Sequence, residues 1–371
     1  MNSETIKNFT ATSHANWKNP GSKLVYFECN SPFSVADIDT DNKSLWRYKH
    51  NIPINESNIV SLGEGLSPLI KINLGSLTAM IKQEQLFPTG SYKDRGATVM
   101  LSHARSVNAT HVIQDSSGNA GCSVAAYSAA AKINCDVYVP EDTSPAKLTQ
   151  IAFYGANLIK IPGDRTATAE AALLAAQNNY YASHCYNPYF YEGTKTFAYE
   201  ICEQLNWTAP DRVILPAGNG TILIGAWLGF KHLLKSKIIS HMPMFIAVQA
   251  EKCSPLYEAW FNNMPINDYK NQGTIAEGIA IESPIRGELM IDIIKATGGS
   301  FITVNEEEII ETFFELGKMG YYVEPTSAAT IAGIIKLKNS INRDELVVSL
   351  FSGHGLKSGD KTAYLMQEKR P

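Results

Sequence analysis

The sequence lacks several features that would assign it to a large class of proteins. Its 32 Lys and Arg residues stand against 36 Asp and Glu, so it offers no basic field for nucleic acid or an anionic membrane. Its six cysteines include no C-x-x-C pair, and we therefore expect neither a metal site nor a disulfide framework. No apolar run is long enough to span a membrane. These absences leave a small molecule as the expected partner.

The first residues also lack the apolar core of a signal peptide. Residues 1–23 are polar, which predicts a protein that stays in the cytoplasm. The chain has 371 residues, of which 44% are hydrophobic and 18% charged. This composition is enough to bury the cores of two domains.

Short apolar runs alternate with helix-length amphipathic stretches from about Thr110 onward. The runs are HVIQD, CDVYVP, NLIKIPG, DRVILPAG, MFIAVQAE, SFITV and LVVSLFSG. Their order predicts the α/β class, with two interleaved domains that each hold a largely parallel sheet flanked by helices. Since no linker separates the halves, we expect an N-terminal arm and part of a large domain over 1–95, a small α/β domain over 96–195, and the remainder of the large domain over 196–371.

Lys93 lies in a polar turn bracketed by glycines, TGSYKDRG (residues 89–96), just before a helical stretch. A lysine amine can form a Schiff base with an aldehyde cofactor where its surroundings favour the neutral form. The alternative is an exposed lysine that only adds solubility.

Two further loops each follow an expected strand and open an expected helix. Residues 116–121 (SSGNAG) offer hydroxyls, an amide and backbone N–H groups to a carboxylate or a ring hydroxyl; ordinary helix capping is the alternative. Residues 218–221 (GNGT) can wrap a phosphate with free backbone N–H groups, or can simply be a flexible turn. Leu223 stands where a dinucleotide-binding loop would have its third glycine.

A fourth feature, LFSGHGLK (residues 350–357), ends a strand of the buried type. It places Ser352 and His354 at the carboxyl edge of the expected sheet, where ligands of open α/β sheets bind.

These stretches together resemble one family. In order, GEGLSPL (63–69), GSYKDRG, SSGNAG, PAGNGT, VEPTSAA (323–329) and SGHGLK are similar to motifs of the tryptophan synthase β family of pyridoxal-phosphate enzymes (fold type II), and within it to the threonine synthases. The resemblance covers roughly residues 45–357.

The resemblance implies a role for each motif. Lys93 would carry the cofactor, pyridoxal 5′-phosphate, as a Schiff base, and Ser352 would face its pyridine nitrogen. Other cofactor-binding residues would be Asn119, at the 3′-oxygen, and Gly218, Asn219, Gly220 and Thr221, around the phosphate. The substrate, a small amino acid, would be bound by Ser116, Ser117, Gly118 and Glu324, although Glu324 is also explained as a first-turn carboxylate that favours a helix dipole.

Ser352 gives the implied chemistry its direction. A neutral hydroxyl leaves the pyridine nitrogen largely unprotonated, which favours elimination or replacement at the β or γ carbon over transamination. The resemblance therefore implies a lyase of the threonine synthase type, which converts O-phosphohomoserine to threonine. It also implies a homodimer.

Some residues depart from the pattern of the enzymes that use O-phosphohomoserine. Those enzymes have Asn-Pro-Tyr-Arg before Glu-Gly, whereas residues 187–193 read NPYFYEG, so Phe190 replaces the arginine. Ala120 and Gly121 stand where hydroxyl residues are usual. Four cations could compensate for the missing groups: Lys147, Arg165, Lys195 and Arg286. A serine or threonine dehydratase, or a β-replacement enzyme on an activated serine, is the alternative that needs no site for a substrate phosphate.

Overall fold

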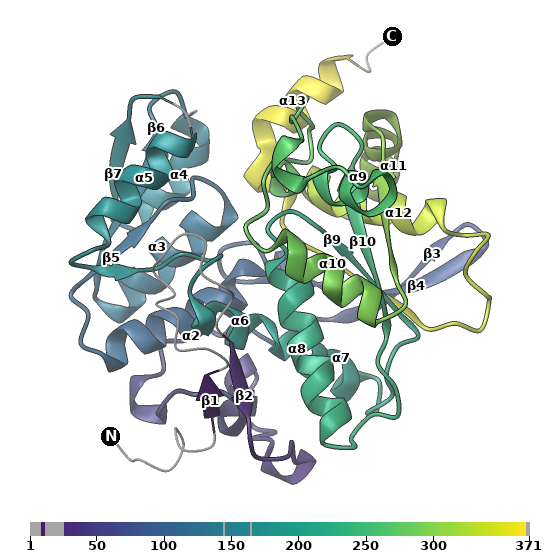
Figure 1. Ribbon diagram of the computed structural model, residues 1–371, viewed down its shortest axis with the longest axis horizontal. Coiled ribbons are helices and arrows are strands. Elements are labelled where there is room, and N and C mark those ends of the chain that lie inside the picture. Colours follow the sequence, from purple (N-terminus) through teal and green to yellow (C-terminus); the bar gives the residue numbers. More distant parts are fainter. Residues whose placement is uncertain (1–8, 12–25, 144, 164, 369–371) are drawn as a thin grey trace. The chain divides into compact units, whose positions relative to one another are not determined.

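The chain divides into two structural units that are interleaved along the sequence. A computed structural model describes residues 9–11, 26–143, 145–163 and 165–368 (Figure 1). Unit 1 comprises residues 1–66 and 87–196, and unit 2 comprises 67–86 and 197–371. Unit 1 ends at Thr196, next to the domain boundary expected at residue 195. Its other end differs from the expectation: residues 1–66 and 87–95 belong to unit 1, together with the domain that was expected to begin at 96. Within the expected arm, residues 1–8 and 12–25 lie outside the described chain.

Unit 1 contains a parallel sheet with the strand order β7-β6-β5-β8. The strands are β5 (His111–Gln114), β6 (Asn134–Pro140), β7 (Asn157–Ile161) and β8 (Tyr180–Tyr181). The helices are α2 (Lys93–Ser106), α3 (Asn119–Ala131), α4 (Pro145–Phe153), α5 (Arg165–Ala175) and α6 (Pro188–Thr194). A short antiparallel pair, β1 (Phe9–Ala11) and β2 (Phe27–Cys29), belongs to the same unit.

The alternation of side chains along the strands explains how helices cover both faces of this sheet. Val137 and Val139 of β6 join a cluster with Val124 of α3 and Ile151 of α4. Residues on the opposite face, such as Ile113, pack in a second cluster with α5. Because successive strand residues point to opposite faces, both faces of a buried parallel strand are apolar.

Unit 2 contains a larger sheet with the strand order β11-β10-β9-β12-β4-β3. The strands are β3 (Leu69–Leu74), β4 (Leu77–Gln83), β9 (Arg212–Pro216), β10 (Met244–Ala250), β11 (Ser300–Val304) and β12 (Val347–Phe351). All neighbours are parallel except β3 and β4, which form a hairpin. The helices are α7 (Thr196–Gln204), α8 (Thr221–Lys235), α9 (Pro255–Asn262), α10 (Gly287–Ala296), α11 (Glu306–Lys318), α12 (Pro325–Lys336) and α13 (Gly359–Glu368).

Helices α8 and α12 lie on opposite faces of this sheet. Phe245 of β10 contacts Phe230 of α8 edge to face, with 6.0 Å between ring centroids. Val248 lies an odd number of residues further along β10, so its side chain points to the opposite face of the sheet. There it packs against α12 at Gly333, where an added Cβ would lie 2.8 Å from the valine side chain. The sheet is therefore covered on both sides, as its continuous apolar runs predict.

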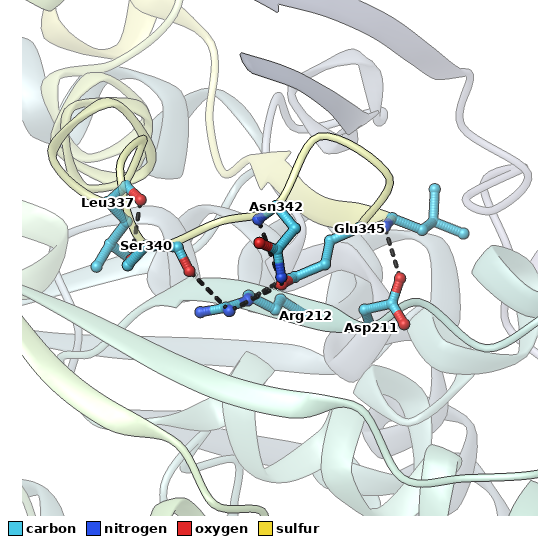
Figure 2. Close-up of polar contacts among 7 residues, drawn as sticks. Asp211, Arg212, Leu337, Ser340, Asn342 and Glu345 are labelled. Carbon is cyan, nitrogen blue, oxygen red and sulfur yellow. Dashed lines mark hydrogen bonds and ion pairs between the residues drawn. The ribbon is translucent and has the colours of Figure 1, made fainter. Parts of the chain in front are cut away.

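A polar cluster fixes β12 beside β9 at the amino ends of the two strands (Figure 2). Arg212 binds the carboxylate of Glu345 with its Nε and Nη2 atoms, and Nη2 also donates to the carbonyl oxygen of Ser340 at 2.9 Å. The backbone N–H of Leu346 donates to Asp211 at 2.6 Å. These contacts hold the loop before β12 and so help to set the register of the strand.

The structure confirms the α/β class, the interleaving and all seven expected strands. Asn305 caps α11 as part of a capping box with Glu308. The β3–β4 hairpin and the short β8 were not predicted from the sequence. Among the helices in the described part of the chain, none has the length and apolar character needed to cross a membrane.

Candidate functional site

Lys93 is the first residue of α2 in unit 1, where the sequence predicted a helix start. Its side chain is partly buried, and its Nζ atom donates to the Tyr92 hydroxyl at 2.7 Å. The same atom lies 5.9 Å from the centroid of the Phe190 ring. An aromatic lining beside a partly buried amine distinguishes Lys93 from a surface lysine that only adds solubility.

The neighbouring residue, Asp94, is fully buried and joins the start of α2 to α3. Its carboxylate accepts from the backbone N–H of Thr89 at 2.8 Å, and from the hydroxyls of Thr89 and Ser123 at 2.5 and 2.6 Å. Burial raises the pKa of Asp94 to about 6, although these hydrogen bonds oppose the shift. The contacts fix the position of Lys93 relative to α3.

Glu64 is a second buried carboxylate in unit 1, and it comes from the GEGLSPL motif. It accepts from the hydroxyl of Tyr127 in α3 at 2.6 Å and from the backbone N–H of Leu62 at 2.8 Å. Burial raises the pKa of Glu64. The motif residue therefore anchors the chain before β3 to α3.

The loop at residues 116–119 lies between β5 and α3, as the sequence predicted. Gly118 is the N-cap of α3, and its backbone N–H donates to the Ser116 hydroxyl at 3.3 Å. Gly121 has a packing reason, because an added Cβ would lie 1.8 Å from the carbonyl oxygen of Ser116. The absence of a hydroxyl side chain at 121 thus follows from the close approach of the loop backbone.

Phe190 forms a buried wall close to Lys93. It lies on α6, it has no exposed surface, and its ring occupies the space beside Gly96 of α2, where a Cβ would lie 2.5 Å from ring atoms. His184 contacts the same ring edge to face at 6.0 Å. Its Nδ1 atom is buried and has no hydrogen-bond partner among the described residues. Burial, with Lys93 and Arg165 as nearby cations, holds the pKa of His184 well below its usual value.

The four cations that could replace the missing arginine have different surroundings. Lys195 is buried in an ion pair with Glu192. Arg286 belongs to unit 2 and is buried at the N-cap of α10. The side chain of Lys147 lies outside the described residues. Arg165, at the exposed start of α5, lies within electrostatic range of Asp115 and His184.

The loop at residues 218–221 connects β9 to α8 in unit 2. Gly220 is the N-cap of this 15-residue helix, whose first turn contains no acidic residue and which no side chain caps within the described chain. At Gly220, φ is +73° and an added Cβ would lie 2.2 Å from the sulfur of Met290. A Cβ at Gly218 would lie 2.8 Å from the carbonyl oxygen of Gly278. The loop therefore presents backbone to an anion at the positive end of a helix.

Ser352 follows β12 at the same edge of the sheet, because β12 pairs with β9 in parallel. It is buried, and its hydroxyl donates to Glu324 Oε1 at 2.7 Å and lies 3.1 Å from the Ser327 hydroxyl. Glu324 is the N-cap residue of α12. His354 instead accepts from the backbone N–H of Leu356 at 3.1 Å and begins a short 3-10 helix.

The structure thus groups the predicted residues by unit. In unit 1, Lys93, Ser116, Ser117, Gly118 and Asn119 lie at the starts of α2 and α3. In unit 2, Gly218, Asn219, Gly220, Thr221, Glu324 and Ser352 lie at strand ends and helix starts on one sheet edge. Sequence reasoning missed His184, Asp94 and Glu64. Glu64 and Asp94 both lay inside quoted motifs, and a carboxylate in a short glycine-rich motif was a usable signal.

Comparisons with known proteins show the family of this chain. Residues 60–353 match the family described as pyridoxal-phosphate dependent enzymes. The chain is 40% identical over 355 residues to the threonine synthase of Methanocaldococcus jannaschii, covering 92% of this chain and 88% of that protein. It is 33% identical over 345 residues to the threonine synthase of Methanosarcina acetivorans, covering 90% and 85%. Among solved structures, it is similar to the serine racemase of Dictyostelium discoideum, with a TM-score of 0.65, 26% identity and coverage of 78% and 92%.

Proposed function

Because the chain belongs to the family of pyridoxal-phosphate-dependent enzymes, we propose that this lyase is a threonine synthase that converts O-phosphohomoserine and water to threonine and phosphate. The observation that carries the proposal is the similarity to threonine synthases over about nine-tenths of the chain, with the motif residues at helix starts and strand ends.

The residues of unit 2 fit the phosphate group of the cofactor. The backbone of 218–221 opens a long helix with no carboxylate in its first turn, and the two glycines stand where a Cβ would collide with neighbours. Gly218, Asn219, Gly220 and Thr221 would therefore hold the phosphate. Ser352, at the end of the adjacent strand, would face the ring nitrogen.

The residues of unit 1 would hold the reactive groups. Pyridoxal phosphate supplies an aldehyde for an amine and a conjugated ring that takes up electrons from the substrate. Lys93 would hold the cofactor, and Asn119 would donate to its 3′-oxygen. Once the substrate amine displaces it, Lys93 would move protons at its Nζ atom.

The substrate carboxylate would bind the loop that begins α3. Ser116 and Ser117 would supply hydroxyls, and the backbone N–H of Gly118, which donates to the Ser116 hydroxyl at 3.3 Å, would turn to the substrate carboxylate instead. Glu324 of unit 2 would face a group of the substrate other than its carboxylate, because two carboxylates repel each other. The hydrogen bond from Ser123 of α3 to Asp94 of α2 fixes the position of this loop relative to Lys93 within unit 1.

Phe190 favours a second candidate function. A fully buried ring, with its centroid 5.9 Å from Lys93 Nζ, gives an apolar surface where the family resemblance implies an arginine. Such a surface suits a dehydratase acting on serine or threonine. We favour threonine synthase because Arg165 provides a candidate cation in the same unit, within electrostatic range of His184, whose Nδ1 atom has no hydrogen-bond partner among the described residues.

Product analysis distinguishes the two candidate functions. The purified enzyme is incubated with O-phosphohomoserine and, separately, with L-threonine. Release of phosphate together with threonine supports the proposal, whereas 2-oxobutyrate from threonine without turnover of O-phosphohomoserine supports the dehydratase.

A lysine pair tests the cofactor assignment. Lys93→Ala should remove the absorbance band of the lysine-bound cofactor, while Lys71→Ala, at an exposed lysine of β3, should retain it. A band that survives in Lys93→Ala would contradict the assignment.

We further infer a cytoplasmic homodimer. The inference is supported by the similarity to threonine synthases over about nine-tenths of the chain. Light scattering on the purified protein should give twice the chain mass of 40.7 kDa.

A further inference from the structure

The side chains of Tyr92 and Lys93 meet at their ends, although the two residues are adjacent in the sequence. Tyr92 is the N-cap residue of α2 and has helical dihedral angles, φ −58° and ψ −15°, and Lys93 is the first residue of the helix. Side chains one residue apart on a helix do not face each other. The Nζ atom of Lys93 nevertheless lies 2.7 Å from the Tyr92 hydroxyl and 4.5 Å from the centroid of its ring. Both side chains therefore extend toward the same place in unit 1.

Hydrogen bonds fix the backbone on both sides of this contact. The backbone N–H of Lys93 donates to the Ser91 hydroxyl at 3.3 Å, and that of Arg95 donates to the carbonyl oxygen of Tyr92 at 3.1 Å. Asp94 joins the same turn to α3. The Tyr92 side chain is 9% exposed, and a tyrosine has fewer rotatable bonds than a lysine. The hydroxyl is therefore the more rigid of the two partners.

A tyrosine hydroxyl can bind the lysine amine in either of its protonation states. An ammonium group donates to the phenol oxygen, whereas a neutral amine has a lone pair to which the phenol O–H donates. The change requires only a rotation of the O–H bond, so both heavy atoms can stay in place. The Phe190 ring, whose centroid lies 5.9 Å from Nζ, offers no hydroxyl for this purpose. The Tyr92 hydroxyl is therefore suited to an amine that gains and loses a proton.

We propose that Tyr92 is a positioning residue that holds the Lys93 amine while this amine removes the α-hydrogen of the substrate. The role rests on the proposed function, in which the substrate amine displaces Lys93 from the cofactor. The released Nζ atom ends a flexible stem that samples many positions unless a partner holds it. The α-hydrogen passes to Nζ as a proton, and the electron pair of the C–H bond stays on the substrate, where the conjugated ring of pyridoxal phosphate draws on it. Removal of the hydroxyl should slow this proton transfer and leave substrate binding unchanged.

Exchange of an α-hydrogen with solvent measures the proton transfer directly. The holoenzyme is incubated in D2O with L-2-aminobutyrate, a small amino acid without a leaving group, and the loss of the α-hydrogen signal is followed by NMR. In Tyr92→Phe the exchange rate at saturating amino acid should fall about tenfold. The half-saturating concentration and the absorbance band of the lysine-bound cofactor should not change, whereas a loosened fold would alter both.

Tyr191→Phe is the matched control. Tyr191 is buried in α6 of the same unit, and its hydroxyl donates to the carbonyl oxygen of Cys185 at 2.9 Å. This variant also loses one buried hydroxyl, but its exchange rate should equal that of the wild type. An exchange rate in Tyr92→Phe as high as in the wild type overturns the proposal.

A crystal structure of the wild-type holoenzyme with bound L-2-aminobutyrate gives a second measurement, which does not depend on how the variants fold. The Nζ atom of Lys93 should lie about 3 Å from the Tyr92 hydroxyl, and an Nζ atom that has moved away from it overturns the proposal. Failure of the proposed function gives a different result. Exchange by the wild type without turnover of O-phosphohomoserine contradicts the threonine synthase and leaves the role of Tyr92 intact, whereas a wild type without the absorbance band contradicts both.

Discussion

Stability should fall as pH rises through the titration of Asp94. This buried carboxyl has a pKa of about 6 in the folded protein, against a usual 3.8. Between these values the folded chain holds a proton that the unfolded chain has released, so the free energy of unfolding decreases with increasing pH. A shift of roughly 2 pKa units at about 1.4 kcal/mol per unit gives a decrease of about 3 kcal/mol between about pH 4 and pH 6.

Asp94→Asn isolates this contribution from other titrating groups. The amide keeps the size of the side chain, and its oxygen can accept from the backbone N–H of Thr89 while its NH2 group donates to the hydroxyls of Thr89 and Ser123. The variant keeps these contacts but has no carboxyl that titrates at this position. Both proteins are unfolded in urea at intervals from about pH 4 to about pH 7. Over this range, the free energy of unfolding of the wild type should fall by about 3 kcal/mol relative to that of Asp94→Asn.

Ser123→Ala provides a directional check on the same carboxyl. The Ser123 hydroxyl donates to Asp94 at 2.6 Å and favours its charged form. Its removal should raise the pKa of Asp94 further and move the decrease in stability to higher pH. A difference between wild type and Asp94→Asn that does not vary with pH would refute the reasoning.

Further predictions concern a strand register, the phosphate loop and the substrate. Arg212→Ala should destabilise unit 2 by about 1 kcal/mol at neutral pH. The loss should be smaller in acid, because Arg212 lowers the pKa of Glu345 and protonation of that carboxylate removes the ion pair. Urea unfolding at both pH values measures the difference. Gly220→Ala should raise the dissociation constant for pyridoxal phosphate about tenfold, because φ is +73° and Met290 blocks the Cβ, as followed by absorbance titration. Arg165→Ala should raise KM for O-phosphohomoserine about tenfold without changing the cofactor spectrum; an unchanged KM would exclude this cation from phosphate binding.

The sequence predicted the strands of both sheets because buried parallel strands are continuous apolar runs. It missed β8, since two residues are too few to show a pattern. The β3–β4 hairpin carried a usable signal: its strands meet at Leu74-Gly75-Ser76-Leu77, and Gly75 has a φ of +71°. The helix starts at Lys93 and Asn119 could be located because capping and glycine signals are local.

The supporting residues of the site could not be predicted in the same way. Asp94 meets Ser123, which is 29 residues away, and Glu64 meets Tyr127, which is 63 residues away. The first pair depends on how α2 packs against α3, and the second on how the segment before β3 packs against α3; no local pattern records either packing. His184 shows the same limit, because only the fold reveals that its Nδ1 atom is buried without a partner among the described residues.

The departure at Phe190 is part of a larger packing arrangement and not an isolated substitution. Helix α6 approaches α2 through two glycines: a Cβ at Gly193 would lie 1.8 Å from the carbonyl oxygen of Arg95, and a Cβ at Gly96 would overlap the Phe190 ring. The ring thus fills a space that Gly96 creates beside Lys93. An arginine there would place a second cation near that amine in a buried setting, at a high desolvation cost. We therefore propose that a substrate anion is bound from another element, and Arg165 at the start of α5 is the candidate cation in unit 1.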